Sequence, residues 1–166
     1  MAKLDSPSAQ RNKGPIWNVL ASDVLPSLPS NEPTRILEIA AGCGVHSLHF
    51  SLELHTTLQQ PFLWYPSDPE AASRASIQAY LDDTTDLKGK LQPPLDLRLT
   101  ENGAVDESAI QDLTFDLILC INMIHISPWE ATLGLMKLAG EKLCSGGTLY
   151  LYGPYKVDGQ AVESNL

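Results

Sequence analysis

The stretch Arg35–His46, RILEIAAGCGVH, decides the fold of this chain. Its first half is a short apolar run interrupted by Glu38, a pattern that predicts a buried strand. Gly42 and Gly44 follow, and because glycine has no Cβ they allow a tight turn and a close approach of the backbone to a ligand. A helix is expected from about Val45, with free N–H groups at its start. A strand, a glycine turn and a helix in this order indicate a ligand site in an α/β fold.

The rest of the chain repeats this alternation of strands and helices. Phe115–Ile121 (FDLILCI) is the strongest strand pattern: apart from Asp116 it is continuously apolar, which is typical of a parallel strand covered on both faces. The other expected elements are strands at Phe62–Tyr65, Leu95–Leu99 and Thr148–Tyr152, and helices over Glu70–Leu81 and from Trp129 to a glycine cap at Ser145-Gly146-Gly147. The alternation predicts an α/β fold with a mostly parallel, Rossmann-like sheet and helices on both faces.

The N-terminal part of the 166-residue chain is expected to differ from the remainder. Residues 1–14 are polar and are expected to form a flexible segment. Pro15 is expected to begin the first helix, because proline suits the first helical turn. Residues 15–166 are long enough for one buried core and are expected to form a single domain.

The composition of the chain limits the classes of partner that the protein is expected to bind. The formal net charge is −9, which disfavours a broad nucleic-acid surface, because such a surface needs clustered Lys and Arg. No signal peptide is recognisable and no apolar stretch approaches the length of a membrane span, so no membrane partner is expected. Cys43, Cys120 and Cys144 lack CxxC spacing and are typical of reduced thiols, so an intracellular, cytoplasmic location is expected.

Glu38 discriminates between the ligands that a glycine loop binds. A dinucleotide fingerprint needs a third glycine or alanine, and Ser47 stands at that position, which weakens a dinucleotide interpretation. A carboxylate ahead of the glycines suits a ligand that carries an ammonium group. The alternative for Glu38 is a buried carboxylate that is satisfied by N–H groups of the loop.

Asp68 lies at the end of the second expected strand. A carboxylate at this place accepts hydrogen bonds from both ribose hydroxyls of a nucleoside. The alternative is a helix N-cap ahead of Pro69 and Glu70. Both functions require nearly the same position, so both remain open.

Candidate catalytic residues are expected beyond the last two strands, because ligands bind at the carboxyl ends of parallel strands. His125 is a candidate general base or, equally, a structural histidine. Tyr155 either covers the acceptor pocket or is an ordinary surface tyrosine. Asn122 either bonds the ligand or holds the loop backbone.

The other histidines cluster in the helix after the glycine loop. His46 is expected at the start of this helix, beside the bound ligand. His46, His49 and His55 have no CxxC or carboxylate partner that would complete a set of ligands, so no metal site is expected.

Several motifs taken together resemble those of the methyltransferase-like protein 26 family. They are RNKGPI (Arg11–Ile16), LEIAAGCGVH (Leu37–His46), Pro66-Ser67-Asp68, CINMIHISPW (Cys120–Trp129) and YGPY (Tyr152–Tyr155). The resemblance runs from about Arg11 to the last residue. It implies a class I methyltransferase fold, S-adenosylmethionine as cosubstrate, and a methyl acceptor that is not established. Glu38, Gly42 and Gly44 match the ExxxGxG pattern of class I methyltransferases.

The chain departs from this family at several positions. Arg98 stands where the family strand usually ends in an aspartate, and Tyr65 stands where relatives often have glutamine. Family members continue past a Ser-Asn pair into a further helix and a β-hairpin, whereas this sequence stops at Ser164-Asn165-Leu166. The resemblance therefore implies a C-terminally truncated form, with Thr148–Tyr152 as an exposed sheet edge.

Three functions remain in competition. The first is an S-adenosylmethionine-dependent methyltransferase acting on a small molecule or a protein. The second is a catalytically inactive protein that keeps the fold as a binding or interaction module. The third, a nucleotide-dependent oxidoreductase, is disfavoured by Glu38 and by Ser47 in place of a third glycine. No pattern indicates an oligomeric state.

Overall fold

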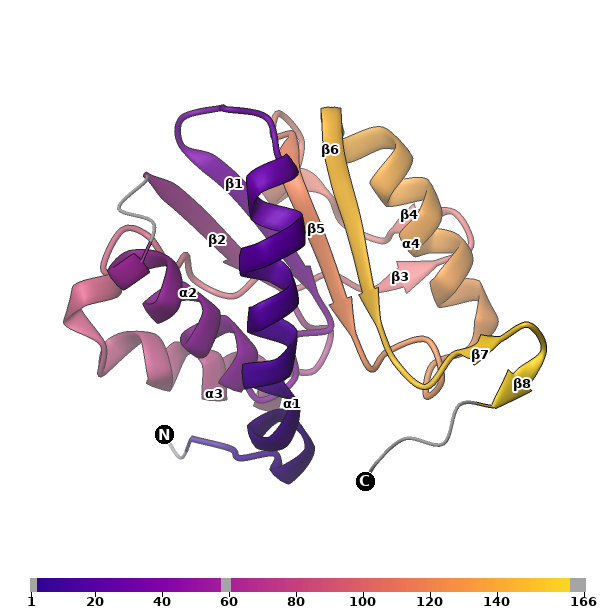
Figure 1. The fold of residues 1–166 in the computed structure, drawn as a ribbon, viewed down its shortest axis with the longest axis horizontal. Coiled ribbons are helices and arrows are strands. Elements are labelled where there is room, and N and C mark those ends of the chain that lie inside the picture. The colour runs from indigo at the N-terminus through magenta and orange to yellow at the C-terminus, as the bar shows by residue number, and fades with distance from the viewer. Residues whose placement is uncertain (1–2, 58–60, 162–166) are drawn as a thin grey trace.

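A computed structural model describes residues 3–57 and 61–161. Its centre is a four-stranded sheet in the order β2-β1-β5-β6, in which every neighbouring pair is parallel (Figure 1). The strands are β1 (Thr34–Ile39), β2 (Phe62–Pro66), β5 (Phe115–Ile121) and β6 (Leu143–Tyr152). The predicted α/β fold with a parallel sheet is confirmed.

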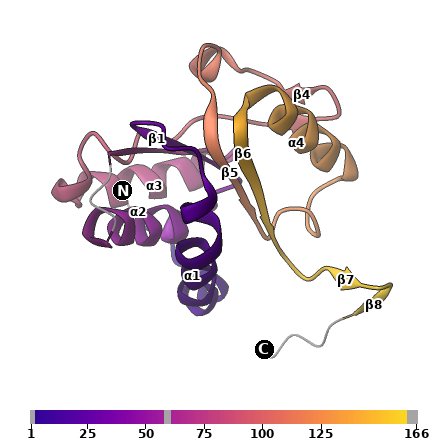
Figure 2. The same cartoon turned by 45° about the horizontal axis from the view of Figure 1, so that its top comes forward.

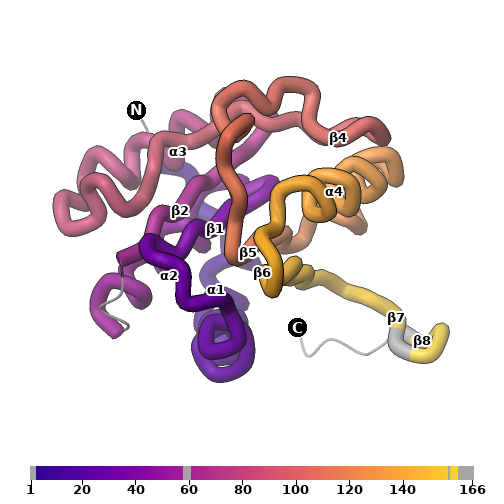
Figure 3. Tube along the Cα trace, turned by 90° about the horizontal axis from the view of Figure 1, so that it is seen from above, coloured from indigo at the N-terminus to yellow at the C-terminus, as the bar shows by residue number. Residues whose placement is uncertain are grey.

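Helices cover both faces of this sheet, as predicted. They are α1 (Pro7–Val19), α2 (Val45–Thr57), α3 (Ala71–Asp82) and α4 (Trp129–Lys142). Figures 2 and 3 show α1 and α2 on one side of the sheet and α4 on the other, while α3 packs beside α2.

Strand β5 contributes side chains to two hydrophobic cores, one on each face of the sheet. All of its residues are buried, and alternate side chains point to opposite faces. Leu117 and Leu119 pack with Phe50 and other residues under α1 and α2. Ile118 packs with Leu135 under α4. The continuous apolar run therefore supplies both cores.

The start of α1 corrects the expectation for residues 1–14. The helix begins at Pro7, where the Ser6 hydroxyl accepts a hydrogen bond from Ala9 N, and Pro15 lies inside it. The expected helix start at Pro15 is wrong, because Ser6 followed by Pro7 is itself a complete N-terminal signal. The segment before the helix is bonded to α3: Leu4 N donates to Ser76 Oγ (2.8 Å). A π-helical turn, η1 (Leu20–Val24), and a 3₁₀ turn, η2 (Leu25–Ser27), continue α1 toward β1.

The expected third strand, Leu95–Leu99, is not a strand of the sheet. After the 3₁₀ turn η3 (Thr85–Leu87), the chain runs along β2 and makes only isolated parallel bridges there, at Leu91 and Leu95. Pro93 and Pro94 lie between the bridges and lack the N–H groups that a regular ladder needs. This segment nevertheless covers the outer edge of β2, because Leu95 N donates to the Pro66 carbonyl.

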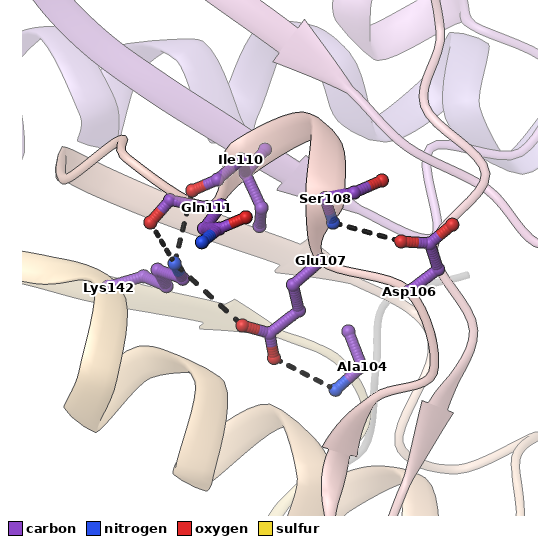
Figure 4. Close-up of polar contacts among 7 residues, drawn as sticks. All are labelled: Ala104, Asp106, Glu107, Ser108, Ile110, Gln111 and Lys142. Carbon is purple, nitrogen blue, oxygen red and sulfur yellow. Dashed lines mark hydrogen bonds and ion pairs between the residues drawn. The ribbon is translucent and has the colours of Figure 1, made fainter.

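The stretch after this segment fastens onto α4. It contains the short antiparallel pair β3 (Leu99–Thr100) and β4 (Gly103–Ala104) and the 3₁₀ turn η4 (Ser108–Ile110). Lys142, in the last turn of α4, donates to the carbonyls of Ile110 (3.1 Å) and Gln111 (2.9 Å), and Glu107 lies beside it (Figure 4). Gly134 lets α4 approach β3, since a Cβ there would collide with the Thr100 carbonyl.

Strand β6 begins immediately after α4, which corrects the expected glycine cap. Gly146 has φ +79° and lies within β6, where the pairing with β5 shifts register. The glycine thus forms a β-bulge instead of ending the helix.

Beyond Tyr152 the chain forms the hairpin β7 (Lys156–Val157) and β8 (Gln160–Ala161), which lies away from the sheet (Figure 1). In the part of the chain that the structure describes, β6 is an edge strand. The expected end of the family pattern at Ser164-Asn165-Leu166 lies outside the described residues. Residues 3–57 and 61–161 include no helix with the length and apolar character of a membrane span.

Candidate functional site

Two adjoining cavities lie at the carboxyl ends of β1 and β5. The first, of about 600 Å³, is walled by the first turn of α1, the glycine loop, the end of β2 and the loop after β5. The second, of about 690 Å³, extends toward Leu97 and Arg98. Both cavities share the residues Ala40, Pro69, Met123 and Ser127. They lie where strand order reverses between β1 and β5, the usual ligand position in open parallel sheets.

The glycine loop adopts the predicted tight turn. Ala40, Gly42 and Gly44 all have positive φ, at +54°, +58° and +90°. A Cβ on Gly44 would lie 2.8 Å from Ile77 Cγ1, so glycine at this position allows the loop to pack on α3. Gly42 lines the first cavity, whereas Gly44 acts through this packing.

Asp68 lines the first cavity and holds its loop. The side chain is 6% exposed; Oδ2 accepts from Gly42 N and Oδ1 from Glu70 N, each at 2.9 Å. Asp68 thus accepts hydrogen bonds from backbone N–H groups, as the N-cap alternative implied. The N-cap residue of α3 is, however, Glu70 and not Asp68. A carboxylate oxygen can accept two hydrogen bonds, and each oxygen of Asp68 accepts one here, so each keeps a lone pair for a ligand hydroxyl.

Glu38 lies beneath the loop and is not part of either cavity wall. Its side chain is 1% exposed, and Oε2 accepts from Ser47 Oγ (2.6 Å) and Trp64 Nε1 (2.9 Å). Burial raises the pKa of Glu38 to about 7, although these two hydrogen bonds lower it. Both hydrogen bonds are accepted by Oε2, and direct contact between Glu38 and a ligand's ammonium group stays a prediction. The predicted buried carboxylate is present, but its partners are side chains.

His46 lies in the wall of the first cavity, at the start of α2, as expected. It is 8% exposed, its Nε2 donates to Asn12 Oδ1 (2.7 Å), and its ring stacks on Phe50. Burial, with smaller contributions from His49 and Lys13, lowers the pKa of His46 to about 4. The imidazole is therefore neutral near pH 7.

Asn122 leads from β5 into the loop that closes the cavity. It has φ +58° and its backbone N–H donates to the Tyr152 carbonyl (2.8 Å), which joins the loop to the end of β6. Asn122 also lines the first cavity, beside Met123 and Ile126. The loop-holding role is thus present, and the position also suits ligand contact.

His125 and Tyr155 lie close to each other but outside both cavity walls. A Cβ on Gly153 would lie 3.4 Å from the Tyr155 hydroxyl and 3.6 Å from His125 Nδ1. Both side chains are exposed, and partial burial raises the pKa of Tyr155. The structure brings the two predicted catalytic residues together at the outer end of β6, away from the glycine loop.

Residues that the sequence did not single out support the site from outside. Asn12 reaches His46 from α1, and Ser76 donates from α3 to the Cys43 carbonyl (2.7 Å). Arg74 donates to the Asp68 carbonyl and pairs with Asp96, each at 2.9 Å. Asn12 lies within the RNKGPI motif, which was a usable signal; Arg74 and Ser76 lie on a helix with no such motif.

The remaining histidines of α2 do not join His46 in a metal site. Lys90 Nζ donates to His55 Nδ1 (2.6 Å), and neither His49 nor His55 lines the two cavities. Within the described ranges, no three His, Cys, Asp or Glu side chains are grouped as metal ligands would be.

A protein-family model matches most of this chain. The family is described as "Protein of unknown function (DUF938)", and its model aligns with residues 3–166.

Solved structures of methyltransferases share the fold. An O-methyltransferase family protein from Burkholderia thailandensis aligns with a TM-score of 0.64 and 17% identity, over 93% of this chain and 41% of that chain. The CurJ carbon methyltransferase aligns with a TM-score of 0.60 and 22% identity, over 89% and 36%. A methyltransferase from Thiobacillus denitrificans, in complex with S-adenosyl-L-homocysteine, aligns with a TM-score of 0.56 and 12% identity, over 88% and 48%. This chain therefore spans less than half the length of each of these three, and the Rossmann-like methyltransferase fold is confirmed.

Proposed function

The chain belongs to the DUF938 family, proteins of unknown function, and from its own cavities we propose that it is an S-adenosylmethionine-dependent methyltransferase. Its acceptor is a small molecule or a protein side chain. The finer likeness to the methyltransferase-like protein 26 family is part of this proposal. The likeness to that family is supported by three residues from different motifs, which lie at the same end of the sheet: Asn12, Asp68 and Asn122.

The observation that carries the proposal is the pair of adjoining cavities with Asp68 in the wall. Their volumes suit a nucleoside with an amino-acid tail, since small-molecule sites occupy about 300–1,000 Å³. Leu97 and Met123 offer apolar surface for a base in the second cavity. Asp68 offers carboxylate oxygens for the ribose, and the polar loop of the first cavity suits the tail.

Glu38 supports the site indirectly in this proposal. Its hydrogen bonds to Ser47 on α2 and Trp64 on β2 hold three elements together directly under the glycine loop. A carboxylate or a neutral carboxyl group can accept both bonds, so the arrangement needs no ligand.

S-adenosylmethionine supplies an activated methyl group on a sulfonium, so the protein's task is mainly to align donor and acceptor. An acceptor atom attacks the methyl carbon as the carbon–sulfur bond breaks, and a proton on the acceptor must leave. His125 and Tyr155 are the proposed residues for receiving or orienting that acceptor. Their place beside Gly153, at the carboxyl end of β6, supports this role.

A non-catalytic binding module is the second candidate. It is favoured by one observation, that His125 and Tyr155 lie outside both cavity walls. Binding of S-adenosylmethionine without turnover against a broad acceptor panel would support this candidate over the first.

Isothermal titration with S-adenosylmethionine, S-adenosylhomocysteine and NAD tests the proposal. We expect heat with both sulfur compounds and none with NAD. We expect Asp68→Ala to weaken S-adenosylhomocysteine binding at least tenfold, about 1.4 kcal/mol. Asp106→Ala is the matched control, because Asp106 also accepts from the N–H two residues ahead but lies outside the cavities. Absence of heat with either sulfur compound would overturn the proposal.

A further inference from the structure

The side chain of His46 is held on two sides. Phe50 stacks on its ring, with centroids 5.5 Å apart and an interplanar angle of 23°. Asn12, one helix away on α1, accepts from Nε2 at 2.7 Å. The ring is thereby fixed in a wall of the first cavity, although it is part of neither the glycine loop nor a strand end.

The contact with Asn12 also selects a tautomer. Because Asn12 Oδ1 is an acceptor, Nε2 must carry the hydrogen, and in a neutral imidazole Nδ1 is then an acceptor. No hydrogen bond to His46 Nδ1 is present within residues 3–57 and 61–161. The buried imidazole therefore offers one unused acceptor atom.

We propose that Asn12 is a positioning residue that presents His46 Nδ1 as the hydrogen-bond acceptor for the ammonium group of the cosubstrate's amino-acid tail. This inference rests on the proposed function. It assigns to His46 the contact that the ExxxGxG pattern suggested for Glu38.

Besides burial, Lys13 lowers the pKa of His46 and so adds positive potential at this place, and an ammonium group here must therefore be held by the hydrogen bond to the imidazole. Ser47 and Trp64 both bond to Oε2 of Glu38, and Glu38 lines neither cavity, so His46 and not Glu38 stands in the wall that the tail would contact. The imidazole is neutral near pH 7, because burial holds its pKa low, and a neutral acceptor does not repel a cation.

The first turn of α1 complements this contact. Ser8 and Ala9 line the same cavity, and the first turn contains no acidic residue. The positive end of a helix dipole favours a carboxylate. The two ends of an amino-acid tail would therefore meet groups of suitable character on the same wall.

The test compares two ligands that differ in the tail. S-adenosylhomocysteine carries the amino acid, and 5′-methylthioadenosine does not. We expect His46→Phe, which retains an aromatic ring against Phe50, to weaken S-adenosylhomocysteine binding at least tenfold while 5′-methylthioadenosine binding stays within twofold. Equal weakening for both ligands would overturn the inference, because it would show a purely structural role.

Variants of Asn12 separate positioning from packing. Asn12→Leu removes the acceptor and is expected to weaken S-adenosylhomocysteine binding at least threefold, with 5′-methylthioadenosine unchanged. Asn12→Asp keeps an acceptor and is expected to retain the affinity within threefold. A loss in Asn12→Asp as large as in Asn12→Leu would contradict the positioning role.

The tautomer gives a readout that does not depend on folding of a variant. The ¹⁵N chemical shifts of His46 in the unsubstituted protein are expected to show hydrogen on Nε2, and a hydrogen on Nδ1 would overturn the inference. If the unsubstituted protein binds neither ligand, the proposed function fails with it. If it binds both ligands equally, only the role of the tail contact fails.

Discussion

Two buried aspartates occupy opposite ends of the sheet and differ in what lies beside them. Asp116, at the amino end, is 3% exposed and accepts from Arg35 N (2.8 Å) and Asn31 Nδ2 (2.6 Å). Asp68, at the carboxyl end, is bonded in the same way to the backbone after β1. Only Asp68 faces a cavity. Burial and hydrogen bonds to the backbone therefore do not mark a ligand site by themselves, whereas an adjoining cavity does.

Asp116→Ala is expected to have the largest effect on the free energy of unfolding. The substitution leaves the Arg35 N–H and the Asn31 amide without their acceptor, and we expect a loss of about 3 kcal/mol. The midpoint of urea unfolding measures it. The folded fraction of the Asp116→Ala variant should bind S-adenosylhomocysteine with the same dissociation constant as the unsubstituted protein. A loss of affinity comparable with that of Asp68→Ala would remove the distinction between the two ends.

Gly44→Ala sharpens the comparison at the carboxyl end. We expect a loss of about 2 kcal/mol in stability, because alanine is strained at φ +90° and its Cβ would collide with Ile77. Gly42→Ala is the matched control: it also has positive φ, but a Cβ there meets nothing within 4 Å. Thermal unfolding of both variants separates the collision from the backbone strain. Equal losses would show that packing on Ile77 does not matter.

Glu38→Gln tests the buried carboxyl group near the carboxyl end of β1. The folded-state pKa of Glu38, about 7, is above the ordinary value of 4.5, so the unfolded state loses its proton first as pH rises. The contribution of Glu38 to stability is therefore fully present below pH 4.5 and is lost as pH rises to about 7. Glutamine does not titrate, and we expect the difference in unfolding free energy between variant and parent to change by at least about 1 kcal/mol over this interval. A difference that stays constant with pH would contradict the raised pKa.

His125→Ala is expected to have the smallest effect on binding. His125 is exposed and lies outside both cavity walls, so the dissociation constant for S-adenosylhomocysteine should change less than twofold. Titration calorimetry measures it. A tenfold change would place His125 in the cosubstrate site and move the boundary of that site to the end of β6.

The parts of the fold that the sequence predicted well are those with strong local patterns. The predicted strand Phe115–Ile121 has the same bounds as β5, because its residues are apolar apart from Asp116 and polar residues flank it on both sides. The strand expected at Leu95–Leu99 failed because Pro93 and Pro94 remove donors just before it. The glycine cap after α4 failed because a left-handed glycine serves a helix end and a β-bulge equally well.

The candidate site was predictable in location but not in detail. Asp68, Gly42, His46 and Asn122 line one cavity because the carboxyl ends of parallel strands meet there. The direction of Glu38 could not be predicted, because it depends on Ser47 and Trp64 from two other elements. The RNKGPI motif draws attention to Asn12, but the pairing of Asn12 with His46 joins two helices and cannot be predicted from either segment alone.

The Ser76 hydroxyl ties together segments that are far apart in the sequence. It accepts from Leu4 N, 72 positions away, and donates to the Cys43 carbonyl, 33 positions away. The contact between Asn12 and His46 spans 34 positions. Each of these contacts closes a long loop, and closing a loop costs chain entropy. A ligand that binds the assembled cavity is therefore expected to stabilise the N-terminal half as a whole and to raise its unfolding temperature.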